Sequence, residues 1–550
     1  MKRLVALVMI LCLLVSSGGC YFSVEYPDPL PAPPTEPVNN DLAFEETEQM
    51  PTEMPFTYTL RQEHVDEFYS LLDQSEQLAL ESTDFEAVDE LTELLDEQYC
   101  LLEDQCSIAQ ILYYSDMSDE TASQRYLDCV DICGDANSAY MEMVRRVYQS
   151  DSPTKDQLFA DWTQQELDML MAYTPEVTQL QKRNSEILVE YQALENTTSD
   201  AMIPLYIEQV QNNNRIAQIY GYKNYYEYAY EMVYDRDYSR EELQVMRGYV
   251  AEYLAPIFEN AYNDYYDAYS QLGFIGQMTI SAFMTNAYND CNKPYFRDYL
   301  ETVPEGMAQS MTQALEAGNS YFTENENAYE GAFTTVIGEQ SFCFFGPGYT
   351  NSMTVAHELG HYYGSLYTDL EALPLDLAET QSQGNEWLFL GYLSENMDEE
   401  VFAAQKSMKL YNDLGTILIC VLVDAFEERI YSSPNLKYYT GEDLNRIMQE
   451  VCAEYGGVDY ISWWVTDIQS YWRMVVVQSP VYYISYAVSA TAAINLYTMY
   501  LNDPQTALEA YRLLIETEGE DAGFLQTIQA AGLPGPFDES VYVALSEIYS

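Results

Sequence analysis

Histidine is the scarcest residue in this sequence. The chain of 550 residues contains 3 histidines, against 52 tyrosines and 89 aspartates and glutamates. This scarcity argues against chance wherever two histidines occur at the spacing of metal ligands. A histidine-based site therefore has very few places in the chain where it can lie.

Basic residues are also few. Lysine and arginine together number 23, which leaves a formal net charge of −66 at pH 7. A surface of this charge repels polyanions, so nucleic acid is excluded as a partner. The acidic residues are expected on solvated helix faces, where they favour the approach of basic peptides.

The body of the chain lacks uninterrupted apolar runs of membrane-spanning length. The run from Ile417 to Val423 is too short to cross a bilayer. The stretch from Met474 to Leu496 is long enough, but Pro480 and several polar residues interrupt it. Neither stretch is predicted to span a membrane.

The N-terminus carries a shorter apolar run with a different meaning. A basic pair precedes the apolar residues 4–15, and small residues at 16–19 lead to Cys20. Residues 1–20 therefore predict a lipoprotein signal peptide, with lipidated Cys20 anchoring the protein to the bacterial cell membrane. Because Ser17 stands where such signals usually have an aliphatic residue, an ordinary cleaved signal and a secreted protein are the alternative.

A proline-rich segment follows the signal. Residues 21–55 are rich in Pro, Glu, Asn and Thr, with four prolines between Pro29 and Pro34. Such a composition cannot bury a core, so we expect an extended tether. The folded part would then work outside the cytoplasm, close to the membrane.

Two of the three histidines form an H-E-x-x-H motif. His357 and His361 are four residues apart in a proline-free segment with helical character, so both fall on one helix face. This spacing suits one zinc ion, and Glu358 is placed to take a proton from a zinc-bound water. The motif predicts a hydrolytic zinc site, with Glu358 as general base.

The third ligand must come from elsewhere in the chain. His64 lies near the start with no ligand spacing, and Tyr367 occupies the place of the third histidine in the extended form of the motif. We therefore expect a carboxylate, and Asp376, Glu379 and Glu386 follow on a helix that begins near Pro374. Glu379 and Glu386 are seven residues apart and share a face.

The combination of H-E-x-x-H with Glu379, Ser382 and Glu386 resembles the thimet oligopeptidase and oligoendopeptidase F family of zinc metallopeptidases. The family has E-x-x-S-x-x-x-E after its zinc motif. The resemblance implies that Glu379 is the third zinc ligand, with Asp376 as its rival. Glu386 would support a ligand rather than bind the metal. Softer similarities in segments 207–225, 235–238 and 530–537 follow in the family's order.

The segment from Pro480 to Ala487 is similar to a family segment that supplies oxyanion donors. The resemblance implies that Tyr483 and Tyr486 hydrogen-bond the oxyanion during peptide hydrolysis. By itself, a tyrosine pair in a chain with 52 tyrosines indicates core packing.

One position departs from the family. Val475 stands where the family usually has a histidine, five residues before Pro480. A lost oxyanion donor costs about 10²–10³ in rate. Either Arg473 or Gln478 replaces that donor, or the protein is a weak peptidase.

The expected fold is mainly α-helical. The resemblance implies two lobes, an N-terminal helical lobe over 56–200 and a catalytic helical lobe over 201–550, with a deep substrate cleft between them. A small β-sheet that includes a strand over 332–338 is expected beside the zinc helix. Helices are predicted over 65–80, 85–114, 176–193 and 240–270, the last with a kink at Pro256.

Cysteine usage fits an exported protein. Eight cysteines remain after Cys12 and Cys20 are set aside. The sequence predicts that Cys100 and Cys106 lie on one helix and Cys129 and Cys133 on a second, antiparallel one, so that disulfides form as Cys100–Cys133 and Cys106–Cys129, with a zinc cluster of these four as the alternative. The leftover pairings are Cys420–Cys452 and Cys291–Cys343.

The sequence as a whole predicts an extracytoplasmic, monomeric zinc endopeptidase that cuts short peptides. His357, His361 and Glu379 would hold zinc, with Glu358 as base and then acid. The alternative is a zinc-containing peptide-binding lipoprotein with weak or no turnover, which the departure at Val475 favours. A binder would have little reason to keep Glu358.

Overall fold

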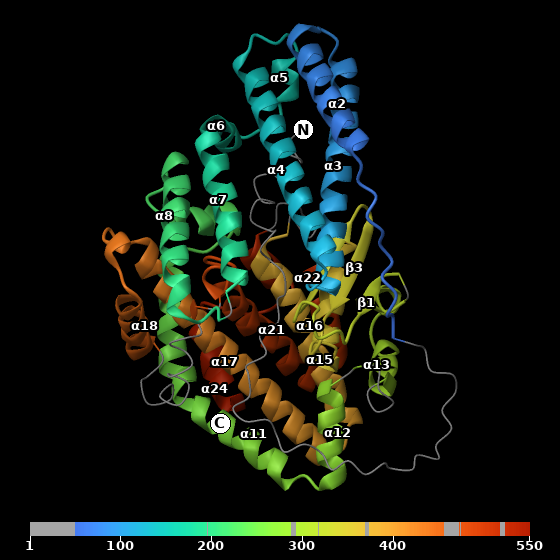
Figure 1. The fold of residues 1–550 in the computed structure, drawn as a ribbon. Coiled ribbons are helices and arrows are strands. Elements are labelled where there is room, and N and C mark those ends of the chain that lie inside the picture. Colours follow the sequence, from blue (N-terminus) through green and yellow to red (C-terminus); the bar gives the residue numbers. More distant parts are fainter. Residues whose placement is uncertain are drawn as a thin grey trace.

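The computed structural model describes residues 50–194, 196–285, 287, 293–316, 318–368, 373–455, 472–473, 475–516 and 523–549. The predicted signal peptide with Cys20, most of the predicted tether and Cys291 lie outside the described residues. The described part is mainly helical and has one small sheet (Figure 1).

Three long helices form the N-terminal bundle, at one end of the molecule in Figure 1. They are α2 (Gln62–Glu81), α3 (Phe85–Ser115) and α4 (Glu120–Gln149). Asp84 and Asp119 cap the starts of α3 and α4, because their carboxylates accept backbone N–H groups of the first turn. The rings of Phe68, Tyr99 and Tyr140 meet at 5.9 and 6.0 Å and hold the three helices together.

The cysteines of this bundle do not form the predicted disulfides. Among the described residues, the cysteines with free thiols include Cys106, Cys129, Cys133, Cys343, Cys420 and Cys452. The Cys129 sulfur lies 3.2 Å from the Tyr58 hydroxyl, whereas contact with Cys106, together with burial, raises the pKa of Cys133. Cys106 thus contacts Cys133, so the predicted Cys100–Cys133 and Cys106–Cys129 disulfides are wrong. The competing zinc cluster is also absent, since no cysteine belongs to a metal-binding group in the described part of the chain.

A series of shorter helices connects the bundle to the sheet. They are α5 (Lys155–Leu158), α6 (Gln164–Ala172), α7 (Pro175–Gln192), α8 (Ile203–Ile219), α9 (Tyr225–Tyr228), α10 (Arg240–Tyr249), α11 (Phe258–Gln271), α12 (Phe274–Thr285), α13 (Lys293–Leu300) and α14 (Glu305–Ala314), with short turns η1 (Asp200–Met202), η2 (Ala229–Val233), η3 (Val250–Leu254) and η4 (Ala255–Ile257). The predicted kink at Pro256 is confirmed. Pro256 lies in η4, between α10 and α11, because proline cannot donate the hydrogen bond that would continue an α-helix.

The sheet has three strands, β1 (Ser320–Phe322), β2 (Ala332–Ile337) and β3 (Gln340–Phe345), in the order β1-β3-β2. A tight turn at Gly338, with φ of 61°, joins β2 to β3 as an antiparallel hairpin. Strand β3 is central and buried, whereas β2 is an edge strand that packs on helix α15. The predicted strand over 332–338 is confirmed to within one residue.

The C-terminal half builds the core around α16. Its helices are α15 (Ser352–Ser365), α16 (Leu375–Asn396), α17 (Glu399–Tyr431), α18 (Gly441–Tyr455), α21 (Ile484–Asn502), α22 (Pro504–Glu516), α23 (Phe524–Ala530) and α24 (Glu539–Tyr549), with the turn η5 (Leu436–Tyr438). Helix α16 is buried from Asp376 to Leu393 and packs against α15 and α21. Such a helix can be buried on all sides only where its polar residues find partners.

Helix α17 crosses this core and carries a buried ion-pair network. The Arg247 guanidinium binds both Asp424 and Glu428, with 2.5 Å to the Glu428 carboxylate. The hydroxyls of Tyr226 and Tyr230 donate to Asp424 at 3.0 and 2.8 Å. Since the Arg247 side chain is 2% exposed, this network fixes α10 and α9 to α17 without help from solvent.

Within the described ranges, no helix is long and apolar enough to cross a membrane. The apolar run 417–423 is buried inside α17, and the described residues from 484 to 496 belong to the buried helix α21.

Candidate metal centre and active site

Helix α15 brings the two motif histidines together. Asn351 caps the helix by accepting the backbone N–H groups of Met353 and Thr354. The rings of His357 and His361, one turn apart, lie with their centroids 5.0 Å apart. Both side chains are buried, which is costly for imidazoles unless partners compensate.

Glu379 of α16 is the carboxylate that meets these histidines. Its Oε2 atom lies 3.5 Å from His357 Nε2 and 3.7 Å from His361 Nε2. Tetrahedral zinc with bonds of 2.0–2.1 Å places its ligands about 3.3 Å apart, close to these distances. In the part of the chain that the structure describes, this is the one group of three or more His, Cys, Asp or Glu side chains close enough to share an ion.

A second carboxylate orients the first histidine. His357 Nδ1 lies 2.7 Å from Glu386 Oε1, which leaves Nε2 directed at Glu379. Lys409 of α17 contacts Glu386 at 3.1 Å and Asp413 at 2.5 Å. Burial alone would raise the pKa of Glu386, but Lys409 and His357 outweigh it and lower the pKa, so Glu386 remains an anion. A carboxylate behind a metal-binding histidine is a common support of zinc sites.

The protein groups alone give the two histidines different pKa values. Burial lowers the pKa of His361 to about 4. For His357, burial acts in the same direction, but hydrogen bonds to Glu379 and Glu386 outweigh it and raise the pKa to about 10. The cluster thus holds one proton strongly on His357, which a bound metal ion would have to displace.

Glu358 lies beside the cluster and faces the sheet. Thr334 of β2 donates its hydroxyl to Glu358 Oε2 at 2.7 Å. The other carboxylate oxygen, Oε1, has no hydrogen-bond partner among the described residues. Burial raises the pKa of Glu358 to about 7, which suits a group that must both accept and release a proton near neutral pH.

The tyrosine segment lies beside the helix that carries Glu379. Helix α21 packs against α16, and Ser485 at its start faces Asp376, three residues before Glu379. The rings of Tyr483 and Tyr486 are 6.0 Å apart, and the Tyr486 hydroxyl lies 3.3 Å from that of Tyr482. The predicted role of Tyr483 and Tyr486 as oxyanion donors stays a prediction.

Of the two residues expected to replace the family's missing histidine, Arg473 has other partners. Val475 is buried in the core, 5% exposed. Arg473 binds the Thr198 carbonyl at 2.7 Å and the Asp200 carboxylate at 2.9 Å. Arg473 is therefore committed to the N-terminal side of the fold, which argues against it as the substitute donor.

The two rival ligands lie outside the cluster. Asp376 is fully buried, and the charge of Arg236 opposes the rise in carboxyl pKa that burial causes. His64 lies in α2 of the N-terminal bundle, where its Nδ1 accepts the backbone N–H of Arg61. The choice of Glu379 over Asp376 and His64 agrees with this geometry.

Three contacts of the site could not be found by motif spacing. Thr334 is one of two threonines on its strand, and only the packing of β2 on α15 brings it to Glu358. Lys409 and Asp413 lie far from the motif in sequence. One signal in the sequence could have indicated a buried pair. Lys409 and Asp413 lie one helical turn apart, just before the apolar run 417–423.

The Glu386 contact predicts a change in metal affinity. Glu386→Gln removes the negative charge behind His357 and is expected to weaken zinc binding about 10–100-fold. Competition with a chromophoric chelator measures this affinity. Glu395→Gln, an exposed change on the same helix, is the matched control and should leave affinity unchanged. Equal affinities for both variants would contradict the supporting role of Glu386.

The close approach of α15 and α16 predicts a second effect. A Cβ atom at Gly360 would lie 2.7 Å from Ser382 Cα and 2.8 Å from the Gln381 carbonyl oxygen. Gly360→Ala should therefore push the two helices apart, lowering both the melting temperature and the zinc content. Gly134→Ala in α4, where nothing lies within 4 Å, should keep or raise stability. A Gly360→Ala protein with normal zinc content and melting temperature would rule out this packing.

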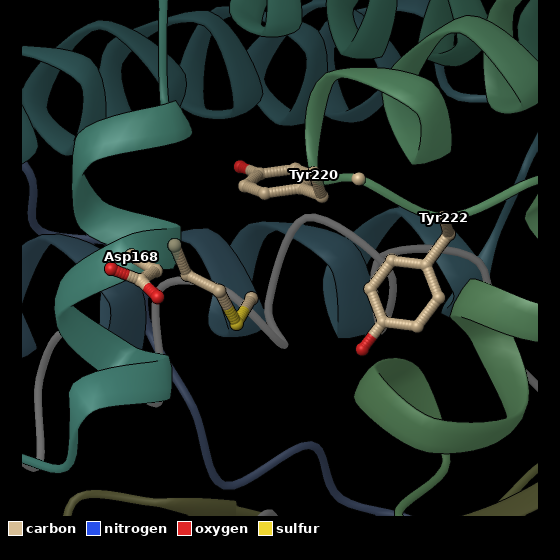
Figure 2. A pocket seen from close by; sticks show the side chains of 5 residues that line it. Asp168, Tyr220 and Tyr222 are labelled. Atoms are coloured by element: carbon tan, nitrogen blue, oxygen red, sulfur yellow. The ribbon is translucent and has the colours of Figure 1, made fainter.

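A cavity elsewhere in the molecule lacks such chemistry. It has a volume of about 350 Å³ between α6 and the end of α8, and is lined by Asp168, Met169, Tyr220, Gly221 and Tyr222. Figure 2 shows Asp168 on one side and the two tyrosines on the other. With one carboxylate and no histidine or cysteine, this cavity does not compete with the histidine cluster as a metal centre.

Comparison with solved structures identifies the fold. The chain is similar to PZ peptidase A, solved with an inhibitor, with a TM-score of 0.68 and 17% identity over 90% of this chain and 98% of that one. It is also similar to oligoendopeptidase F from Enterococcus faecium, with a TM-score of 0.54 and 14% identity over 89% of this chain and 96% of that one. No family model and no curated protein matches the sequence. These similar structures have a two-lobed helical fold, so the resemblance seen in the motifs is confirmed for the fold.

Proposed function

We propose that this chain, which shares the fold of PZ peptidase A and oligoendopeptidase F, is a zinc-dependent endopeptidase that hydrolyses short peptides. The observation that carries the proposal is the buried group of His357, His361 and Glu379 with Glu358 beside it. Three protein ligands of this type leave a fourth position for water or substrate, as in catalytic zinc sites.

Each residue of the site would have a separate role in peptide hydrolysis. The chemistry that zinc supplies when bound is a lowered pKa of water and polarisation of the scissile carbonyl. Glu358, through the oxygen that Thr334 leaves unoccupied, accepts the proton of the attacking water and then donates it to the leaving amine. Thr334 keeps the carboxylate in one orientation throughout.

Two further elements would bind the substrate. Strand β2 is an edge of the sheet beside the zinc helix, so an extended peptide can pair with its backbone. Tyr483 and Tyr486 would donate hydrogen bonds to the oxyanion as the water attacks. The restriction to short peptides rests on the names of the structural neighbours and on the cleft between two lobes expected from the resemblance.

The proposed place of action is outside the cytoplasm. A signal peptide over residues 1–20, lipidation at Cys20 and a tether over 21–55 would hold a monomeric enzyme at the bacterial cell membrane. The boundary between the proposed lobes lies near residue 200.

Hydrolysis of a mixed set of quenched fluorescent peptides tests the proposal. We expect cleavage that a chelator abolishes and that added zinc restores, with internal cut sites in peptides of limited length. Cleavage that resists the chelator, or release of terminal residues alone, would overturn it.

The alternative is a peptide-binding lipoprotein with little turnover, which the buried valine at position 475 favours. Such a protein would bind zinc and retain fluorescent peptides in equilibrium dialysis without cutting them. Detectable turnover that depends on zinc would exclude this alternative.

A further inference from the structure

We propose that Arg236 is a positioning residue for the tyrosine segment, an inference that rests on the proposed function. The guanidinium of Arg236 is buried, 8% exposed, and lies more than two hundred residues from that segment in sequence. Its Nη2 atom donates to three acceptors there, the carbonyls of Val481 and Tyr482 at 2.9 and 3.2 Å and the Ser485 hydroxyl at 3.0 Å. In sequence these acceptors lie on both sides of Tyr483, and the last of them, Ser485, directly precedes Tyr486.

The segment that Arg236 binds is strained. Val481 has a φ of 61°, in the left-handed region that β-branched residues rarely adopt. A strained conformation persists only where its surroundings determine it, and such positions cluster at functional sites. The Val481 side chain is 1% exposed, so the strained turn is locked inside the protein rather than at a mobile surface.

Other polar groups hold the same turn from separate parts of the chain. Glu427 of α17 accepts the backbone N–H of Val481 at 2.9 Å. Tyr234 donates to the Pro480 carbonyl at 2.7 Å, and Gln209 of α8 donates to the Val477 carbonyl at 2.8 Å. These three bonds to the backbone of the turn thus come from buried or half-buried side chains outside it. Among these side chains that hydrogen-bond the turn, Arg236 bears a full positive charge.

The same arginine links the turn to the proposed metal centre. Arg236 opposes the charge of Asp376 in the first turn of α16, one helical turn before Glu379. Ser485 faces both Arg236 and Asp376. The rings of Tyr230 and Tyr234 lie 4.3 and 4.5 Å from the guanidinium and fix its plane. Arg236 therefore fixes the position of the tyrosine segment relative to α16, the helix that carries the proposed third ligand Glu379.

Lysine cannot reproduce this arrangement. A guanidinium is planar, stacks on aromatic rings and directs its N–H groups along fixed directions, whereas an ammonium is a point charge on a flexible stem. Arg236→Lys keeps the charge opposite Asp376 and removes the directed bonds, so it separates positioning from charge balance.

The test compares Arg236→Lys and Ser485→Ala with Ser489→Ala. Ser489 is a buried serine one turn further along α21, and its hydroxyl donates to the carbonyls of Ser485 and Tyr486 in its own helix. We expect Arg236→Lys to lower kcat about 10²-fold, in the range of a lost oxyanion donor, with KM and zinc content nearly unchanged. Ser485→Ala should show a smaller loss of the same kind, and Ser489→Ala none.

A second readout does not depend on activity. In hydrogen exchange followed by mass spectrometry, peptides from 477–487 should exchange faster in Arg236→Lys, and peptides from α15 should not.

Loss of zinc in proportion to activity, or equal exchange in the variant and the wild type, would overturn the proposal. If Arg236→Lys does not fold, the contrast between Ser485→Ala and Ser489→Ala decides in the same way. A wild-type protein without chelator-sensitive hydrolysis would refute the proposed function, and the exchange data would still decide whether Arg236 holds the turn.

Discussion

Replacement of Glu358 by glutamine is expected to lower the rate of peptide hydrolysis about 10²–10⁴-fold, the usual contribution of a general base. Glutamine has the same shape but cannot take up a proton. The Thr334 hydroxyl can still donate to its side-chain oxygen, so the position of the side chain is preserved. Initial rates on a quenched fluorescent peptide, compared with wild-type protein at the same concentration, measure the loss.

The zinc content of the Glu358→Gln protein is the internal control. The three proposed ligand side chains do not include Glu358, so the variant should bind as much zinc as the wild type. Wild-type rates in the variant would contradict the role of Glu358 as base. A loss of activity that follows a loss of zinc would mean that Glu358 acts on the metal site and not on the proton.

Replacement of Arg247 by methionine is expected to have the largest effect on stability. The change leaves Asp424, 1% exposed, and Glu428 in the core without their shared cation. Removing one partner of a buried ion pair costs about 3–5 kcal/mol of unfolding free energy. The midpoint of urea unfolding, followed by circular dichroism, should fall well below that of the wild type.

The matched control for this prediction is Arg446→Met. Arg446 also contacts two acids, Asp443 at 3.3 Å and Glu450 at 3.0 Å, but its side chain is 57% exposed. Solvent screens such pairs, so the urea midpoint should barely move. An equal loss of stability in the two variants would mean that burial does not explain how much the Arg247 ion pairs stabilise the protein.

The histidine pair of the proposed metal site was predictable from local periodicity, because His357 and His361 lie one turn apart on one helix. Periodicity left Asp376, Glu379 and Glu386 as candidates for the third ligand, and the resemblance of Glu379, Ser382 and Glu386 to the family's motif favoured Glu379. The long helices were predictable for the same reason, since α3 begins at the expected Phe85 and ends within a residue of its expected end.

The features that could not be predicted from the sequence depend on packing between elements that lie far apart in it. The cysteine pairing was mispredicted because the relative register of α3 and α4 is set by buried rings such as Tyr99 and Tyr140, and not by cysteine spacing. The contact from Thr334 to Glu358 depends on the packing of β2 on α15. Arg236 reaches the tyrosine segment across about 245 positions, a distance at which spacing carries no signal.

Zinc titration of metal-free protein shows whether hydrolysis depends on an occupied histidine site. The protein is stripped with a chelator, zinc is added in steps, and bound zinc and peptide hydrolysis are measured on the same samples. We expect hydrolysis to rise in proportion to bound zinc and to reach its plateau when the proposed site of His357, His361 and Glu379 is filled. Full hydrolysis by the stripped protein, or a filled site without hydrolysis, would contradict it.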